Sequence, residues 1–196
     1  DTNKMKVIIH QFVTLTENDV PIKMSTRKAQ YITLDELINE VGADVVRYFF
    51  IMRSMNSHLN FDLTLAKKES EENPVYYLQY AHARICNIIK NATEQDLTIE
   101  EDCDLSQLNN TAEITLIKLL LEFPEIIKSS LNSLEPQSIA NYLKEISTLF
   151  HKYYAKERII TTNLELTKAR LLLTNAIKIV IYNGLSILGI EAPERM

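Results

Sequence analysis

Glycine is scarce in this chain. Among 196 residues only three are glycine, Gly42, Gly184 and Gly189, whereas an average usage of about 7% would give roughly 14. Glycine supplies the left-handed backbone of tight hairpins and of loops that cradle phosphate groups. Because none occurs from Ala43 to Asn183, that span excludes a Walker loop, a GxGxxG dinucleotide-binding turn and a many-stranded sandwich. The composition therefore predicts a mainly α protein, built as a bundle of long helices.

Signals for metal binding, disulfides and membrane insertion are also missing. Cys86 and Cys103 form no CxxC pair, and the four histidines show no metal-ligand spacing. We therefore expect no metal site and two reduced thiols in a cytoplasmic protein. No apolar run approaches the ~20 residues of a membrane span, so we expect no membrane partner. The first residue is not Met and a strand-like segment follows almost at once, which indicates the C-terminal part of a longer protein.

The net charge of −5 is distributed unevenly. Residues 1–93 are neutral, residues 94–136 carry a net charge of −8, and residues 137–196 carry +3. The acidic surplus centres on residues 94–104, where six carboxylates occur without a Lys or Arg. Such a segment is typical of a solvated loop between helices, and it would also keep a polyanion away from that edge. A net-negative chain excludes strong non-specific binding of nucleic acid, so we expect no DNA partner, whereas selective binding stays open.

Residues 1–62 are predicted to contain both strands and helices. Met5–Thr14 is rich in β-forming residues, and residues 17–19 are predicted to turn this strand into a hairpin with residues 20–22. Thr33 and Glu36 have the spacing of a capping box, which predicts a short helix ending at Gly42. A second helix is expected over residues 43–52. Residues 56–62 are polar, which we interpret as an irregular segment and as the boundary between domains 1–62 and 63–196.

Residues 63–196 have helical periodicity throughout, and five helices are expected. The first covers residues 63–72, and the second follows Asn73-Pro74, a favourable cap and first position, and runs to about Ala92. Its core stripe consists of Leu78, Ala81, Ile85 and Ile89. The other three are expected over about 111–130, from Pro136 onward and over about 166–188. Pro124 should kink or split the third helix, and Gly189 should cap the last.

The segment KMSTRK, residues 23–28, places three cations after the hairpin and before the capped helix. A cationic loop of this kind can stabilise the charge that develops on a transferring or departing phosphate. Exposed basic loops without such a role are common, so both interpretations stay open on these residues alone.

A second candidate lies on the helix that follows Asn73. At 100° per residue, Tyr77, Tyr80 and Arg84 share one stripe beside the core face. Two phenol rings and a guanidinium offer stacking surfaces, donors and one cation, which suit recognition of single-stranded loops. Tyrosines that only rim the core would give the same pattern, although nine Tyr against six Phe is more polar-tipped aromatic than a core needs. A third candidate is the sequence HKYY at residues 151–154.

Five segments occur along the chain in a specific order: KMSTR (23–27), TLDELINEVGADVVRYFF (33–50), SHLNFDL (57–63), NPVYYLQYAHARI (73–85) and LGIEAPERM (188–196). Together they resemble the C-terminal part of the arginyl-tRNA synthetases. KMSTR alone is weak, because short lysine motifs recur widely, whereas NPVYYLQYAHAR followed by a terminal APERM is highly specific. The resemblance covers nearly the whole chain.

The resemblance implies a class I aminoacyl-tRNA synthetase, an arginine–tRNA ligase that activates arginine with ATP and Mg²⁺ and esterifies tRNA(Arg). It implies that residues 1–62 are the end of a Rossmann-type catalytic domain, a short α/β remnant with the signature loop and stem-contact helices. Residues 63–196 would then be the α-helical anticodon-binding domain. The HIGH signature of the class does not occur, so we expect this chain alone not to aminoacylate. ATP and arginine would bind through a catalytic half that the chain lacks.

The resemblance also assigns site residues. Lys23, Met24 and Ser25 match the KMSKS-type loop that contacts ATP and pyrophosphate, and Thr26 stands where the second lysine of that loop usually lies. Contacts to tRNA are implied at five positions: Tyr77, Tyr80, Arg84, Tyr154 and Met196. The first three are the residues that helical geometry already places on one stripe. A few base–aromatic contacts, each contributing on the order of 1–3 kcal/mol, can select an anticodon without a strongly basic surface.

One alternative belongs to another functional class: a helical protein-interaction module without RNA binding, with the tyrosine stripe as a groove for a partner. Affinity for tRNA(Arg), compared with affinity for the same tRNA carrying a changed middle anticodon base, separates the two interpretations.

Overall fold

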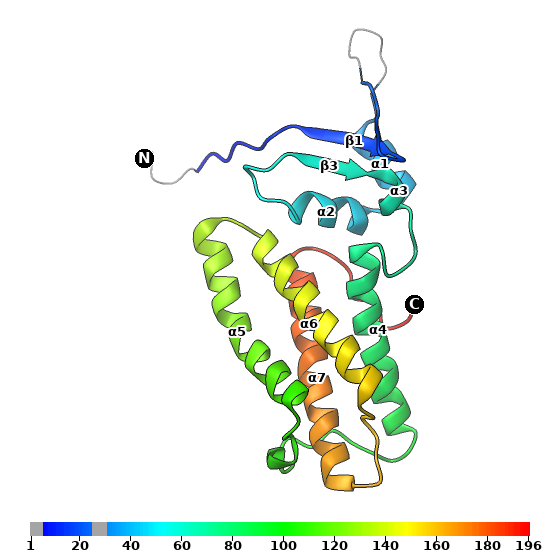
Figure 1. Ribbon diagram of the computed structural model, residues 1–196, viewed down its shortest axis with the longest axis vertical. Helices are drawn as coiled ribbons and strands as arrows, with labels where there is room; N and C mark the ends of the chain where they lie inside the picture. Colours follow the sequence, from blue (N-terminus) through cyan, green and yellow to red (C-terminus); the bar gives the residue numbers. More distant parts are fainter. Residues whose placement is uncertain (1–5, 25–30) are drawn as a thin grey trace.

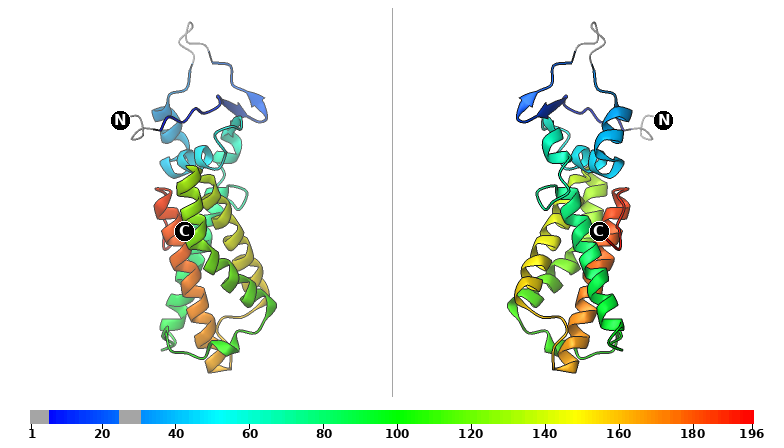
Figure 2. Two further views of the ribbon diagram at one scale, coloured as in Figure 1. Left: turned by 90° about the vertical axis from the view of Figure 1, so that its left-hand side faces the viewer. Right: turned by 90° about the vertical axis from the view of Figure 1, so that its right-hand side faces the viewer.

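The computed structural model describes residues 6–24 and 31–196. These residues form a small sheet with three short helices at one end and a bundle of four long helices next to it (Figures 1 and 2). The chain enters the bundle at α4, and its C-terminal tail returns to lie beside the same helix (Figure 1). Most of the described residues are helical, which confirms the predicted mainly α class.

The sheet has the strand order β2–β1–β3. β1 (Val13–Glu17) pairs antiparallel with β2 (Val20–Pro21) and parallel with β3 (Leu59–Asp62). The register sets Leu15 opposite Phe61, and both side chains are buried. Asn18 and Asp19, with φ of 51° and 64°, form the two-residue turn of the predicted hairpin, because both positions of such a turn need left-handed backbone.

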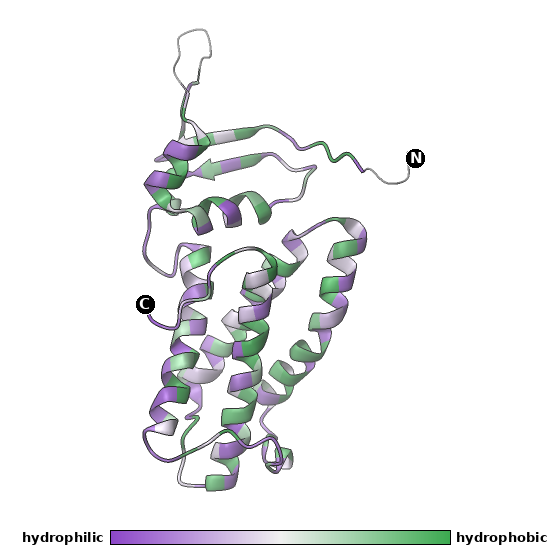
Figure 3. Ribbon diagram, turned by 180° about the vertical axis from the view of Figure 1, so that it is seen from behind, coloured by the Kyte–Doolittle hydropathy of each residue, from purple (hydrophilic) through white to green (hydrophobic). Residues whose placement is uncertain are grey.

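Two predictions for this unit are wrong. The first strand begins at Val13 and not at Met5, which lies outside the described residues, because no strand among those described pairs with residues 6–12. Val7, Ile8, Ile9 and Phe12 of that segment are exposed, and the colouring near the N-terminus in Figure 3 shows that the segment contains hydrophobic residues. In addition, Leu59–Asp62 is a strand and not irregular, with Leu59 and Phe61 buried. Two alternating apolar residues give too short a pattern to reveal a strand whose partner is distant in sequence.

The helix α2 packs against this sheet, and α1 packs against α2. α1 (Leu34–Val41) begins with the predicted capping box: the Glu36 N–H donates to Thr33 Oγ1, and the Thr33 N–H donates to Glu36 Oε2. Gly42, with φ of 89°, separates α1 from α2 (Ala43–Ile51). α2 packs against β3, where the rings of Phe49 and Phe61 lie 5.0 Å apart between centroids. The sheet and α2 therefore form one packed unit.

α3 (Leu63–Ala66) is shorter than the helix predicted for residues 63–72, and it packs against β1 and β3. The sequence KKESEE that follows has no apolar face to bury, so a longer helix there would gain nothing from packing. Asn73 closes the segment, because its Nδ2 donates to the Ala66 carbonyl (3.1 Å) and its Oδ1 accepts from the Val75 N–H (3.1 Å). The second bond caps the first bundle helix.

The bundle consists of α4 (Pro74–Thr93), α5 (Thr111–Ser133), α6 (Gln137–Lys156) and α7 (Leu164–Ile187), with the short 3-10 helix η3 (Leu105–Gln107) before α5. The bundle has four helices and not the predicted five, because α3 packs against β1 and β3 of the sheet. Pro124 does not split α5, which continues through it with Leu119 and Phe123 buried in the core. The other predicted helices are confirmed to within a few residues at their ends.

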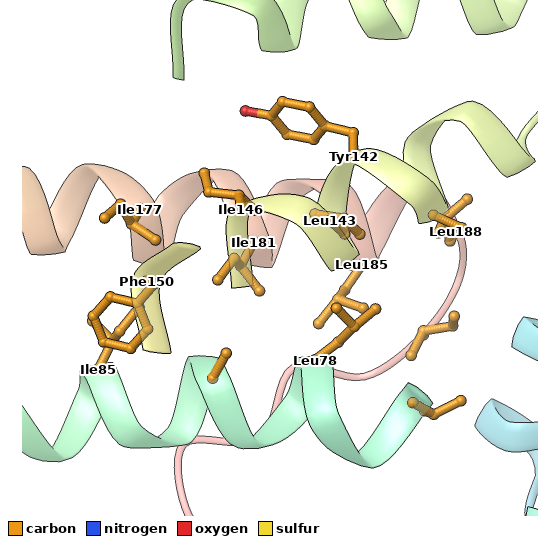
Figure 4. Close-up of a cluster of buried hydrophobic side chains, with 14 of the residues drawn as sticks. Leu78, Ile85, Tyr142, Leu143, Ile146, Phe150, Ile177, Ile181, Leu185 and Leu188 are labelled. Atoms are coloured by element: carbon orange, nitrogen blue, oxygen red, sulfur yellow. The ribbon is translucent and has the colours of Figure 1, made fainter. Parts of the chain in front are cut away.

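The bundle core lies between α4, α6 and α7 (Figure 4). Leu78, Ala81 and Ile85 of the predicted stripe are fully buried, while Ile89 is partly exposed. The fully buried side chains that face them from α6 and α7 are Leu143, Ile146, Phe150, Ile177, Ile181 and Leu185. This layer joins the three helices and determines which side of α4 faces outward.

α6 and α7 approach each other closely at Gly184. A Cβ atom on Gly184 would lie 2.5 Å from Leu143 Cδ2 and 3.0 Å from Leu143 Cγ. Leu143 is itself fully buried, so it has little room to move. Leu188 is the C-cap of α7, one residue earlier than predicted, and Gly189 follows it with the left-handed backbone (φ of 68°) that commonly ends a helix.

Within residues 6–24 and 31–196, no helix is long and apolar enough to cross a membrane. In the same residues no three His, Cys, Asp or Glu side chains gather as ligands of a metal ion would. Cys86 and Cys103 are free thiols, and burial raises the pKa of both.

Gly184→Ala should lower the free energy of unfolding by about 1 kcal/mol, as measured by urea denaturation. Alanine gains up to about 1 kcal/mol in helix propensity over glycine, but displacing a packed core side chain typically costs about 1–3 kcal/mol. Asn183→Ala changes the exposed neighbouring position and should be neutral or slightly stabilising. Adding Leu143→Val to Gly184→Ala should cost less than Leu143→Val costs alone. A Gly184→Ala variant as stable as the natural chain would contradict this packing argument.

Candidate nucleic-acid interface

Residues from three separate segments line one pocket of about 730 Å³ beside α4. Its walls come from α4, from the end of α6 and from the C-terminal tail. The lining residues are Tyr80, Ala83, Arg84, Cys86, Asn87, Ile88, Lys90, Tyr154, Glu194, Arg195 and Met196. Four of the five predicted tRNA contacts are in this set, and the fifth, Tyr77, lies beside it.

The α4 wall is built from the predicted stripe. Because Leu78 and Ile85 are buried in the core, helical periodicity turns Tyr77, Tyr80 and Arg84 toward α6 on the flank of the helix. The guanidinium carbon of Arg84 lies 4.9 Å from the ring centroid of Tyr80. All three side chains are half-buried. The stripe is therefore an ordered array of rings and one cation.

α6 supplies the facing wall through Tyr154, and His151, one turn earlier on the same helix, packs against Tyr77 and Tyr80. The Arg84 guanidinium lies 5.2 Å from the Tyr154 ring centroid, so one cation bridges the aromatic rings of two helices. The His151 ring lies 4.9 Å from the Tyr77 ring and 5.8 Å from the Tyr80 ring, between centroids. Tyr77 is thus tied to the array through His151. Cation–π contacts of this kind contribute about 0.5–2 kcal/mol each.

His151 is held as a neutral acceptor. Its Nδ1 lies 3.2 Å from Arg84 Nη1, which can only donate, so Nδ1 accepts this hydrogen bond. Burial lowers the pKa of His151, and the positive charge of Arg84 lowers it further. The neutral ring leaves Arg84 in place between the two tyrosines, whereas a protonated ring would repel it.

The pocket carries more positive than negative charge. Among the side chains that line it, Arg84, Lys90 and Arg195 are cationic and Glu194 is acidic. Lys90 lies 3.7 Å from Glu94 at an exposed ion pair, which contributes little to stability. The exposed ammonium remains available to a ligand phosphate, so the pocket combines aromatic faces with a modest cationic edge.

The HKYY segment divides between the pocket and the core. Tyr154 lines the pocket, and His151 packs against Tyr77 and Tyr80 beside it. Tyr153 is buried, and its hydroxyl donates to Glu113 Oε1 (3.0 Å). Burial raises the pKa of Tyr153, and the Glu113 carboxylate raises it further. Arg170 Nε donates to the same carboxylate oxygen (2.7 Å). Tyr153 is thus part of a buried polar network and not of the pocket surface.

Two residues of the predicted phosphate loop, Lys23 and Met24, lie outside this pocket. Lys23 and Met24 are exposed and follow β2 in the sheet unit, and neither lines the pocket. Ser25 and Thr26 lie outside the described residues.

Sequence reasoning missed several lining residues. Asn87 and Lys90 follow Arg84 at spacings of three, so the helical periodicity that singled out the stripe could have revealed them. His151, which contacts Arg84 but does not itself line the pocket, belongs to the candidate segment HKYY, where it had no assigned role. Arg195 had no local signal, because the tail reaches the pocket through contacts distant in sequence.

Replacing His151 by Gln should reduce the pH dependence of stability. The folded-state pKa of His151 is lowered, so its contribution is fully present above the unfolded-state pKa of about 6.5 and is lost as pH falls through the folded-state pKa. The free energy of unfolding of the natural chain minus that of His151→Gln, from urea denaturation, should therefore decrease between about pH 8 and about pH 5. Groups common to both proteins cancel in this difference, so a constant difference would show that the His151 pKa is not lowered.

Comparison with known proteins gives the pocket a context. Residues 78–196 match the family described as the DALR anticodon binding domain. Over all of its residues the chain is 52% identical to an arginine–tRNA ligase of Salinibacter ruber and 48% identical to one of Carboxydothermus hydrogenoformans, covering 35% and 36% of those proteins. The chain therefore spans about a third of the length of the curated relatives it matches.

Solved structures agree in fold. A putative arginyl-tRNA synthetase from Campylobacter jejuni matches all of this chain with a TM-score of 0.85 at 30% identity, over 42% of its own chain. An arginyl-tRNA synthetase from Thermus thermophilus matches 87% of this chain with a TM-score of 0.69 at 25% identity, over 29% of its own chain. The matched family region, residues 78–196, contains every residue that lines the pocket. The motif-based resemblance is thus confirmed, and the chain belongs to the DALR anticodon binding domain family.

Proposed function

We propose that this chain is the C-terminal, tRNA-binding part of an arginine–tRNA ligase and that the pocket binds bases of the tRNA(Arg) anticodon. The observation that carries the proposal is convergence: Tyr80, Arg84, Tyr154 and Met196 come from three distant segments and line one pocket. The relatives are named arginine–tRNA ligases, which supports the proposed ligase activity of the complete protein and tRNA(Arg) as its substrate.

The aromatic array suits bases that are splayed out of a loop. Tyr80 and Tyr154 offer ring faces, and each base stacked on such a face contributes on the order of 1–3 kcal/mol. Arg84 is already oriented by its two ring contacts and by His151. Its remaining N–H groups can donate to acceptors on a base edge, which carries sequence information. Met196, half-exposed at the end of the tail, supplies an apolar contact from the opposite wall.

We further propose a division of labour along the chain. Residues 1–62 belong to the catalytic domain, and residues 63–196 to the anticodon-binding domain. In the ligase, Lys23, Met24 and Ser25 act on ATP, with Lys23 stabilising the charge that develops on the departing pyrophosphate. The two free thiols support a cytoplasmic protein.

The chain should bind tRNA(Arg) more tightly than the same tRNA with a changed middle anticodon base, as measured by filter binding. Tyr80→Ala and Tyr154→Ala should each weaken binding of tRNA(Arg) by roughly 5- to 100-fold, because each removes a stacking surface. In the complete ligase, Tyr154→Ala should affect the use of tRNA much more than the affinity for ATP or arginine.

Tyr31→Ala serves as the matched control, since Tyr31 is exposed and lies outside the pocket, and its binding should equal that of the natural chain. Equal affinity for the two tRNAs, or no binding of either, would refute anticodon recognition and favour a module that binds a protein partner.

Lys23→Ala in the complete ligase should lower the rate of arginine activation by roughly 10²-fold, because it removes a preorganised charge near the leaving group. ATP–pyrophosphate exchange measures the activation step, and tRNA affinity should be nearly unchanged. Lys6→Ala, at another exposed position, is the control. An unchanged exchange rate in Lys23→Ala would remove this lysine from the mechanism.

A further inference from the structure

The C-terminal tail reaches the pocket by passing along the outer side of α4 (Figures 1 and 3). After Gly189 the side chain of Ile190 is buried, and its N–H donates to the Leu185 carbonyl (2.9 Å). Beyond Ile190, among the described residues, no backbone–backbone hydrogen bond involves residues 191–196. Side chains of other elements must therefore hold this part of the tail.

One attachment is a closed set of three hydrogen bonds. Gln79 Nε2 donates to Asp44 Oδ2 (2.9 Å) and to the Glu191 carbonyl (3.0 Å). The Glu191 N–H donates to the same Asp44 Oδ2 (3.2 Å). Asp44 belongs to the first turn of α2 and Gln79 to α4. This junction therefore joins the sheet unit, the pocket helix and the tail.

A second attachment lies one turn further along α4. His82 is buried, and its Nδ1 lies 2.9 Å from the Pro193 carbonyl. A carbonyl can only accept, so His82 Nδ1 carries the proton. Pro193 directly precedes Glu194, Arg195 and Met196, which line the pocket. The two attachments thus fix the direction in which the last three residues leave α4.

We propose that Asp44, Gln79 and His82 are positioning residues for anticodon recognition. They hold the tail so that residues 194–196 close the pocket, and they make that wall depend on α2, a helix outside the bundle. This inference rests on the proposed function of the pocket. It assigns no contact between these three residues and the RNA, because none of them lines the pocket. Their effect on binding passes through the tail.

The first test uses Gln79→Leu in the full chain. The substitution removes the two hydrogen bonds that Gln79 donates and leaves only the bond from the Glu191 N–H to Asp44, so affinity for tRNA(Arg) should fall roughly 5- to 20-fold, while affinity for the tRNA with a changed middle anticodon base should stay the same. Gln107→Leu is the matched control, because Gln107 Nε2 makes the same kind of contact to Asp104 Oδ2 (3.0 Å) away from the tail. Unchanged discrimination between the two tRNAs in Gln79→Leu would overturn the proposal.

The second test asks whether Gln79 acts through the tail. Deleting residues 194–196 should weaken binding of tRNA(Arg), and Gln79→Leu should then add little further loss, because both changes remove the same wall. Fully additive losses would overturn the proposal. His82→Leu should behave like Gln79→Leu, and His82→Asn should restore binding, since its amide nitrogen can replace Nδ1 as the donor. Failure of His82→Asn to restore binding would count against the hydrogen bond to Pro193.

The third test does not need RNA. With ¹³C-labelled methionine methyl groups, Met196 should give a resonance shifted by the nearby Tyr80 and Tyr154 rings. In Gln79→Leu this resonance should narrow and move toward the position of a free methionine, and in Gln107→Leu it should not. An unmoved Met196 resonance in Gln79→Leu refutes the junction even if the natural chain does not discriminate between the tRNAs. If the natural chain binds the two tRNAs equally while the Met196 resonance moves in Gln79→Leu, only the proposed function of the pocket is refuted.

Discussion

Burial of one stripe of α4 is the constraint on which the rest of the structure depends. Leu78, Ala81 and Ile85 are fully buried against α6 and α7, so α4 cannot rotate without exposing them to water. The fixed rotation of α4 about its axis determines what each of its two flanks faces. Tyr80 and Arg84 face α6 and its aromatic rings, while Gln79 and His82 face the tail on the other side. The pocket and its proposed support are thus both consequences of where the core of one helix lies, and neither needs a special backbone conformation on α4.

The facing wall is held by charge that is buried away from water. Glu113 of α5 accepts from Arg170 of α7 and from Tyr153 of α6, and Arg170 also donates to Glu157 (3.0 Å) just beyond α6. Removing one partner of such a network leaves an uncompensated buried charge, which costs about 3–5 kcal/mol. Tyr154 is the next residue after Tyr153. The network therefore fixes the end of α6 at the point where the Tyr154 ring enters the pocket, so one segment contributes both to the stability of the fold and to the proposed binding site.

Local patterns predicted the parts of this molecule that depend on local physics. Helical periodicity identified the stripe of α4, and residue type identified the caps at Thr33 and Asn73. What the sequence did not reveal depends on pairing across long separations: β3 contains too few apolar residues to be recognised, and its partner is β1. The same reason explains the tail, whose attachments at Gln79 and His82 are made by residues more than one hundred positions away. The helix predicted for residues 63–72 was wrong for another reason: residues 67–72 have helical propensity but no apolar face, and propensity alone did not extend the helix beyond Ala66.

The charge distribution bears on how such a pocket can select its ligand. Three cationic side chains and one acidic side chain line it, within a chain whose net charge is −5. Each phosphate contact to a single strand adds only about 0.7 to the slope of log affinity against log salt, so few contacts mean little sequence-independent attraction. The acidic segment 94–104 follows the end of α4, and there Lys168 pairs with Glu100 (2.9 Å). Under the proposed function, RNA would be repelled beyond the pocket and attracted to it only weakly, so stacking on Tyr80 and Tyr154 would have to supply the affinity. A surface that attracts RNA weakly gains most of its binding energy from the bases it is shaped to accept, so the shortage of positive charge favours selectivity.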